Sequence, residues 1–131
     1  MSEELLTENA YFSIQTLGSR RSIKMSIGEV DIGFLKFHFP GELSEKKAEG
    51  VRKYGVDPLR VAELNWIETY FGYKRRGYGT LLLKRFEQIC VDLGASGVVL
   101  ELRPSEISRN FYEKNGYLHL HDAERRMVKK L

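Results

Sequence analysis

The chain has a single cysteine, Cys90, so it cannot form an intramolecular disulfide or a zinc site built from several cysteines. It contains no apolar run near the roughly 20 residues that a membrane span needs. The residues from Met1 to Glu4 are polar and acidic, unlike a secretory signal peptide. A lone thiol fits a reducing compartment. We therefore expect a cytoplasmic protein with no membrane partner.

Charge of one sign does not dominate either. The net charge is +3 over 131 residues, with 30% charged and 42% hydrophobic residues, which is ordinary for one globular domain, here taken as 1–131. Basic residues are scattered except at Lys74, Arg75 and Arg76, a cluster that suits a compact anion better than a nucleic acid. The three histidines show no spacing to other ligands, so we expect no metal site.

Three strands separated by glycine turns open the sequence. Alternating apolar and polar residues predict strands over 11–17, 21–27 and 30–39, with turns at Gly18-Ser19 and Gly28-Glu29. This is an antiparallel meander. The polar segment 42–59 follows, and it reads either as a short helix over 46–54 capped by Ser44 or as a mobile loop.

The second half alternates strands with helices. We expect strands at 60–70, 98–102, 117–121 and 125–131, and helices at 78–93 and 106–115. In the strand 60–70, simple alternation places Leu64 and Trp66 on one face and Glu63 and Ile67 on the other. The order predicts an α/β or α+β fold built on a mixed sheet.

A glycine-containing loop, from Lys74 to Thr80, joins a predicted strand to a helix. The first turn of a helix has unpaired N–H groups and a partial positive charge, and Gly77 and Gly79 leave room for a diphosphate beside them. The alternative is that both glycines only shape a sharp turn. Walker and Rossmann patterns are both absent, because no Gly-Lys-Ser/Thr and no third glycine follow.

Two motifs resemble the GNAT N-acetyltransferase superfamily. Lys74-Arg75-Arg76-Gly77-Tyr78-Gly79 is similar to its pyrophosphate loop, Gln/Arg-x-x-Gly-x-Gly/Ala, with lysine at the first position. The segment from Ser108 to Tyr117 is similar to its Ala-x-x-Phe/Leu-Tyr-x-x-x-Gly-Phe signature. The resemblance covers Val61 to Leu131 and implies a mostly antiparallel twisted sheet of about six to seven strands with helices on its faces.

The resemblance implies acetyl transfer from acetyl-CoA to a primary amine by direct attack in a ternary complex. Tyr112 takes the place of the general acid; the alternative is a tyrosine that only packs beside Phe111. Glu63 takes the place of the base; the alternatives are an exposed strand residue with no catalytic role, a water chain as the base, and Glu68 or Glu101. The implied cofactor-binding residues, which also include Tyr112, are Ile67, Thr69, Lys74, Arg75, Arg76, Gly77, Tyr78, Gly79, Thr80 and Ser105. The amide of Ile67 is the candidate oxyanion donor.

The sequence departs from the family before residue 61. Many members carry two helices between their first two strands, where this chain has only a short turn. Either these helices are absent or the first strand is misassigned, and the insert 41–59 is a candidate replacement wall for the acceptor site. The sequence does not identify the acceptor, which could be a small amine, an amino sugar, or a peptide or protein amine. The rival hypothesis is a non-catalytic module that binds coenzyme A or regulates a partner. A homodimer through an exposed strand edge is a further possibility.

Overall fold

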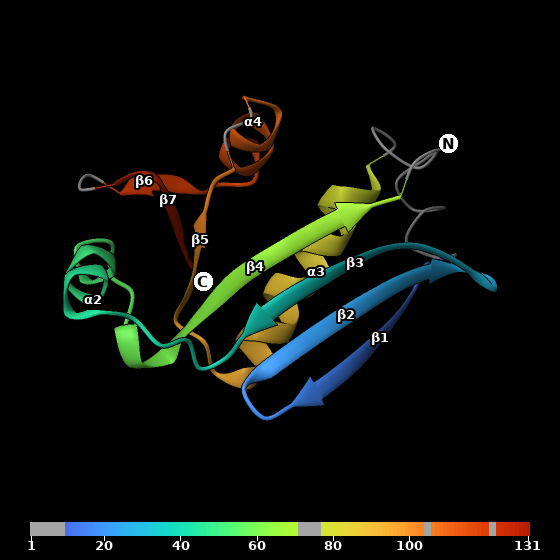
Figure 1. Ribbon diagram of the computed structural model, residues 1–131, viewed down its shortest axis with the longest axis horizontal. Helices are drawn as coiled ribbons and strands as arrows, with labels where there is room; N and C mark the ends of the chain where they lie inside the picture. The colour runs from blue at the N-terminus through green and yellow to red at the C-terminus, as the bar shows by residue number, and fades with distance from the viewer. Residues whose placement is uncertain (1–9, 71–76, 104–105, 121–122) are drawn as a thin grey trace.

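The computed structural model describes residues 10–70, 77–103, 106–120 and 123–131 (Figure 1). Its strands form one sheet in the order β1-β2-β3-β4-β5-β7-β6. Only the β4–β5 pair is parallel. The strands are β1 (Ala10–Leu17), β2 (Arg20–Ile27), β3 (Val30–His38), β4 (Val61–Thr69), β5 (Gly97–Glu101), β6 (Leu118–Leu120) and β7 (Ala123–Lys130). The helices are α2 (Glu45–Arg52), η1 (Pro58–Arg60), α3 (Tyr78–Leu93) and α4 (Glu106–Lys114). The mixed, mostly antiparallel sheet is confirmed.

The first three strands form the predicted meander. β1 pairs with β2 in an unbroken register from Ala10 opposite Ile27 to Leu17 opposite Arg20. Gly18, with a φ of +63°, stands in the turn between them, where the left-handed backbone of a tight hairpin favours glycine. Because only two residues separate β1 from β2, no helix lies between these strands. The first strand is therefore correctly placed, and the pair of family helices is missing from this position.

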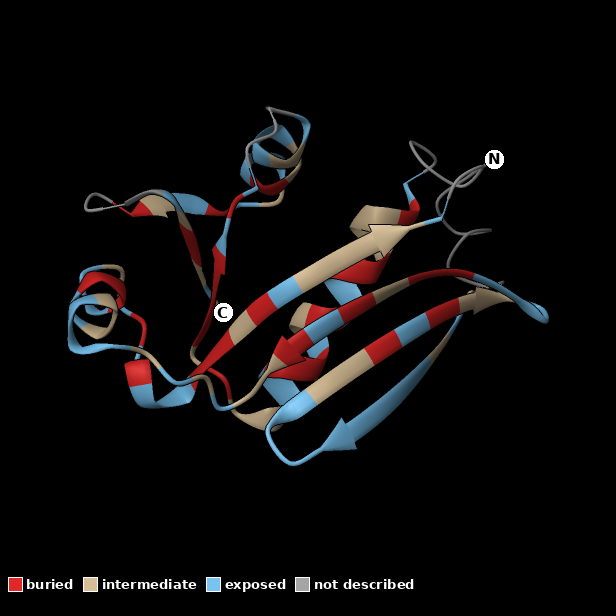
Figure 2. Ribbon diagram, in the orientation of Figure 1, coloured by how far each residue is buried: buried red, intermediate tan, exposed pale blue. Residues whose placement is uncertain are grey.

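Helix α3 covers one face of the sheet, over β3 and β4. Its bounds are those predicted from the apolar stripe, and Gly94 ends it in the left-handed conformation, with its N–H directed at the carbonyls of Cys90 and Val91. The buried Phe86 contacts Phe37 of β3 edge-to-face, with ring centroids 4.8 Å apart. Burial of a side chain of this size stabilises the fold by about 1.5–3 kcal/mol. Figure 2 shows buried residues along β3 and the first half of β4, the strands that α3 covers.

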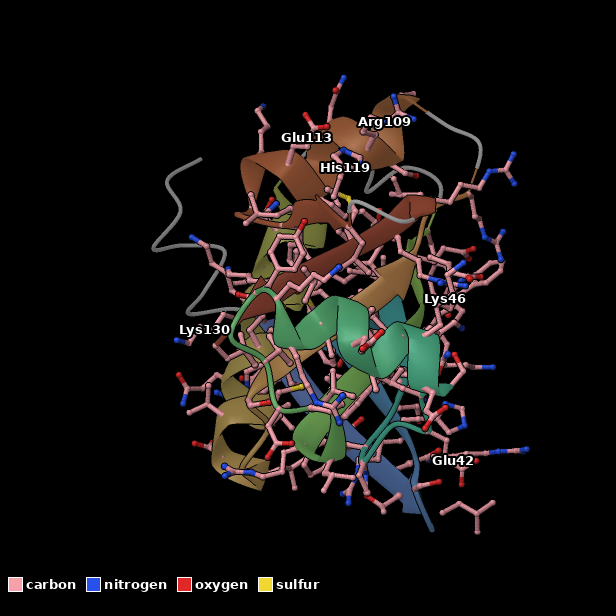
Figure 3. All side chains as sticks on the ribbon, turned by 90° about the vertical axis from the view of Figure 1, so that its left-hand side faces the viewer. Glu42, Lys46, Arg109, Glu113, His119 and Lys130 are labelled. Atoms are coloured by element: carbon pink, nitrogen blue, oxygen red, sulfur yellow. The ribbon has the colours of Figure 1, made fainter. Side chains whose placement is uncertain are left out.

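Helix α2 lies on the opposite face. Val61 and Ala62 are neighbours on β4 and therefore point to opposite faces. Ala62 packs in the cluster under α3, whereas Val61 packs with Val51 of α2 in a separate cluster. Figure 3 views the molecule with α2 in front of the sheet. The capped helix is thus present: the Ser44 hydroxyl accepts a hydrogen bond from the Lys47 N–H at 3.3 Å. Mobility of the segment 41–59 stays a prediction.

A β-bulge in β4 changes which side chains reach each face. Trp66 pairs with Lys36 and Leu64 with Phe37, so Asn65 is an extra residue between them. The alternation reverses there. Ile67 packs with the α3-side core that contains Leu64, and Trp66 points to the α2 side. The prediction that Trp66 shares a face with Leu64, and Ile67 with Glu63, is wrong because of this bulge.

The parallel strands β4 and β5 separate after a short stretch. They pair from Val61 opposite Gly97 to Leu64 opposite Leu100, while β4 continues alone on this side to Thr69. Figure 1 shows the two strands diverging beyond that point. The sheet is therefore open between the second half of β4 and α4. Across the described ranges, no helix is both long and apolar enough to span a bilayer.

Candidate active site

A cleft of about 630 Å³ occupies the opening between β4, β5 and α4. It is lined by the second half of β4, the start of α3, the end of β5 and one side of α4. The predicted site residues that it brings together are Ile67, Thr69, Gly77, Gly79, Thr80 and Tyr112. Lys74, Arg75, Arg76 and Ser105 lie outside the described residues.

The backbone of β4 presents free polar groups to this cleft. The Tyr70 N–H donates to the Ile32 carbonyl of β3 at 2.9 Å. Hydrogen-bonded and non-hydrogen-bonded pairs alternate along an antiparallel ladder. Since Leu35 lies opposite Ile67 and Gly33 opposite Thr69, both β4 residues fall in non-hydrogen-bonded pairs. Their N–H and C=O groups therefore point away from β3, toward the cleft.

The N-terminus of α3 borders the same cleft. Gly77 is the N-cap residue, with φ +84° and ψ 0°, a conformation that glycine adopts without a Cβ clash. No side chain caps this end, so the first-turn N–H groups of Gly79 and Thr80 have no intrahelical partner. The buried Tyr78 side chain packs in the core, so only its backbone can meet a ligand. These amides form a positive end suited to an anion.

Tyr112 stands on α4 with its ring in the core and its edge in the cleft. The ring contacts those of Phe111 and Tyr117, with centroid distances of 5.2 and 5.5 Å. Burial raises the pKa of the Tyr112 hydroxyl to about 12, and the nearby positive charge of Arg103 acts in the opposite direction. The hydroxyl is therefore protonated at neutral pH and can act as a proton donor.

A second, smaller pocket of about 180 Å³ lies on the α2 side of the sheet. It contains Glu63, together with Leu43 and Lys47 from the segment that carries α2. The Glu63 Oε1 atom accepts a hydrogen bond from the Glu42 N–H at 2.7 Å, which orients the carboxylate. The structure thus does not place Glu63 and Tyr112 in one cavity; they lie in separate cavities.

The two cavities meet where β4 and β5 separate. They share four lining residues, Leu64, Asn65, Leu100 and Glu101. Glu101 is the shared carboxylate, and its Oε1 lies 3.2 Å from Arg126 Nε and 3.9 Å from Lys47 Nζ. Its side chain is 64% exposed, so these ion pairs contribute little to stability. Glu101, only a secondary candidate on sequence grounds, therefore occupies the junction that Glu63 does not reach.

Sequence reasoning missed an aromatic–cation pair across the opening. Arg103 Cζ lies 3.5 Å from the centroid of the Trp66 ring, and both side chains line the cleft. The Trp66 Nε1 atom is buried and has no hydrogen-bond partner among the described residues. The two residues come from different elements 37 positions apart, so no local pattern signals their contact.

No cluster of histidine, cysteine or carboxylate side chains that could hold a metal ion occurs in the described part of the chain. His38 Nδ1 instead contacts Asn65 Oδ1, and His119 Nε2 lies 2.9 Å from Glu113 Oε1. The latter two side chains point toward one another in Figure 3. His121 lies outside the described residues. The site chemistry is therefore built from backbone amides, carboxylates, Tyr112 and Arg103.

A family model described as "Acetyltransferase (GNAT) family" matches residues 13–117. The chain belongs to the GNAT family. The description of the family names its members as acetyltransferases. No curated protein sequence matches the chain significantly.

Solved GNAT structures share the fold at low sequence identity. PaiA N-acetyltransferase from Thermoplasma acidophilum, solved with coenzyme A, is 20% identical, with a TM-score of 0.65 over 86% of this chain. The match spans 62% of that protein's length. A putative GNAT acetyltransferase from Desulfovibrio desulfuricans is 14% identical, with a TM-score of 0.67 over 93% of this chain and 98% of its own. AtaT complexed with acetyl-methionyl-tRNA is 14% identical, with a TM-score of 0.66 over 86% of this chain and 71% of its own.

Proposed function

We propose that the chain is an N-acetyltransferase that moves the acetyl group of acetyl-CoA to a primary amine by direct attack in a ternary complex. The observation that carries the proposal is the meeting of two cavities at the separation of β4 and β5. One cavity has the features of a cofactor cleft. The other offers carboxylates to an amine. Two substrates that enter from opposite faces of the sheet would meet at Leu64, Asn65, Leu100 and Glu101.

The larger cleft is the proposed acetyl-CoA site. The first-turn amides of α3 and the glycine at 77 suit the pyrophosphate. The cleft-facing backbone groups of Ile67 and Thr69 suit the amide-bearing pantetheine arm, which pairs with β4 as an added strand would. The N–H of Ile67 is the proposed oxyanion donor, because it points into the cleft beside the bulge at Asn65. Lys74, Arg75, Arg76 and Ser105 remain proposed contacts from outside the described residues.

The smaller pocket is the proposed acceptor site. The segment that carries α2 supplies Leu43 and Lys47 to its wall, in place of the family helices missing between β1 and β2. A carboxylate there attracts an ammonium group and then accepts its proton. Glu63 is the proposed base, held by the Glu42 N–H. Glu101 is the alternative base, because it reaches both cavities.

In the proposed reaction the neutral amine nitrogen forms a C–N bond with the thioester carbon, and the C–S bond breaks. The nitrogen then releases a second proton to water, because the carboxylate already holds the proton that it took from the ammonium group. Tyr112, kept protonated by its burial, gives its proton to the departing sulfur and regains one from solvent before the next turnover. A raised pKa suits this role, because the hydroxyl is fully protonated at the start of each turnover.

The acceptor class is tested with a panel of amines. PaiA, AtaT and other relatives share only the fold at this identity, so the panel should contain polyamines, amino sugars, peptide α-amines, lysine peptides and aminoacyl-tRNA. Release of free thiol from acetyl-CoA is followed with a colorimetric thiol reagent. At least one amine should raise the rate well above that of hydrolysis. If aminoacyl-tRNA alone is active, our expectation of no nucleic-acid partner is wrong.

The rival proposal is a coenzyme A-binding module without catalysis. It predicts binding of acetyl-CoA with no thiol release for any amine. If the protein does not bind acetyl-CoA or coenzyme A at all, both proposals are excluded. We also propose a cytoplasmic location, since the free thiol of Cys90 fits a reducing compartment.

A further inference from the structure

Strand β1 forms an edge of the sheet, and no other strand of the described part of the chain pairs with its outer side. It lies at one end of the strand order, and most of its length is exposed in Figure 2. Its eight residues, Ala10–Leu17, include no charged residue and no proline, the usual devices that block pairing at a sheet edge. Tyr11, Ile14 and Leu17 are exposed by 63%, 48% and 78%. The opposite edge strand, β6, has only three residues.

The backbone register shows which groups of β1 face outward. The Phe39 N–H donates to the Ser19 carbonyl at 2.9 Å, so these two residues form a hydrogen-bonded pair at the end of the β2–β3 ladder. Alternation then directs the backbone of Ile23 to β3 and that of Ser22 and Lys24 to β1. Their partners in β1 are Gln15 and Ser13, so the backbone groups of these two residues face β2. The intervening residues Phe12, Ile14 and Thr16 therefore present free N–H and C=O groups at the edge.

This edge is complementary to itself. An antiparallel pair centred on Ile14 places Phe12 opposite Thr16 of a second copy. Both have their backbone groups aimed at the partner. The same register places Tyr11 opposite Leu17 on one face and Ile14 opposite Ile14 on the other. All cross-strand pairs fall on matching faces, because the paired residue numbers differ by even steps. The three most exposed apolar residues of β1 would all gain apolar neighbours.

We propose that the chain forms a two-fold homodimer by antiparallel pairing of β1 with β1 of a second copy, which joins the two sheets into one. A two-fold axis makes such an interface isologous, as this register requires. The absence of charge along β1 means that no like charges meet across the axis. The dimer is independent of acetyl transfer, because β2 and β3 separate β1 from β4 and its cleft.

Ile14→Asp tests the proposal, because it places two carboxylates opposite each other at the axis. Analytical ultracentrifugation of the whole chain should give about twice the 15.2 kDa monomer mass for the unmodified protein. The variant should have a dimer dissociation constant at least about tenfold higher. Leu59→Asp is the matched control, because Leu59 is also exposed and lies in η1, away from β1. A monomeric unmodified protein at hundreds of micromolar would overturn the proposal.

Cysteine cross-linking keeps the test decisive if Ile14→Asp fails to fold. In the proposed register the two Ile14 Cα atoms lie about 5.5 Å apart, within disulfide range. The two copies of Thr16 lie roughly 14 Å apart along the strands. Ile14→Cys should therefore cross-link on oxidation and Thr16→Cys should not. Equal cross-linking of both, or cross-linking of Thr16→Cys alone, would exclude this register, as would a dimer of Ile14→Asp as tight as the unmodified one.

Discussion

The guanidinium of Arg103 lies over the indole ring of Trp66, with Cζ 3.5 Å from the ring centroid. The contact connects β4 to the residues that follow β5, across the point where the two strands separate. The positive charge of Arg103 also lowers the pKa of the Tyr112 hydroxyl, so one cation contacts the cleft wall and acts electrostatically on the proposed acid. Stacking of this kind contributes on the order of 0.5–2 kcal/mol.

Replacement of Arg103 by lysine should weaken this connection, because an ammonium cannot stack as a planar guanidinium does. We expect kcat to fall several-fold with little change in overall stability. Trp66 is the single tryptophan of the chain, so its fluorescence reports on the cleft directly. Arg103→Lys should change the emission before acetyl-CoA is added. Arg85→Lys is the control, since Arg85 also lies over an aromatic ring, that of Phe12, with Cζ 5.5 Å from its centroid, but lines neither cavity. Unchanged emission and kinetics would remove Arg103 from the account.

Gly77→Glu should abolish acetyl-CoA binding. A glutamate there adds negative charge at the positive end of α3 and strains a residue whose φ is +84°. Isothermal titration calorimetry should detect no binding, while circular dichroism confirms the fold. Gly18→Glu is a matched control: its φ is +63°, with no neighbour within 4 Å of the added Cβ, and it lies in the β1–β2 turn. Retained affinity in Gly77→Glu would contradict the assignment of the pyrophosphate site.

Tyr112→Phe should preserve acetyl-CoA affinity and lower kcat by about 10²–10⁴-fold, the range for loss of a general acid. Because burial raises its pKa to about 12, the hydroxyl stays protonated through neutral and mildly alkaline pH. It should therefore cause no decline in rate below about pH 10. Tyr54→Phe removes a hydroxyl that donates to the His119 carbonyl on the other face, and should affect stability but not rate. If the two variants behave alike, Tyr112 has only a packing role.

The two carboxylates of the proposed acceptor pocket predict different kinetic effects. If Glu63 is the base, Glu63→Gln should lower kcat/KM by about 10²-fold, through a lower kcat. Glu101→Gln should then change mainly KM, since it also loosens the contacts with Lys47 and Arg126. The reverse pattern would assign the base to Glu101. Full activity in both variants would favour a water chain.

The sequence predicted much of the fold because the periodic signals were strong. The apolar stripe of α3 gave its bounds correctly, from Tyr78 to Leu93, and the turn glycines located the meander. The bulge at Asn65 was not predicted, since an inserted residue leaves no mark in a sequence that still alternates. That error exchanged the faces of Trp66 and Ile67.

The site was predictable only where a motif marks it. Gly77, Gly79 and Tyr112 stand in motifs, and the structure places all three at one cleft. Leu43 and Lys47 belong to an insert with no motif, and only the packing of α2 brings them to Glu63. Contacts that depend on how distant elements pack are not encoded in local patterns, so the residues of the proposed acceptor wall could be named only from the fold.

The central claim is that acetyl groups pass from acetyl-CoA to an amine in one complex. Product formation is the most direct test: with the best amine of the panel, mass spectrometry quantifies acetylated amine while free thiol is measured in the same sample. We predict one acetylated amine per thiol released, with both lost in Gly77→Glu. Thiol release without acetylated amine, or intact acetyl-CoA binding with neither product for any amine, would contradict the account.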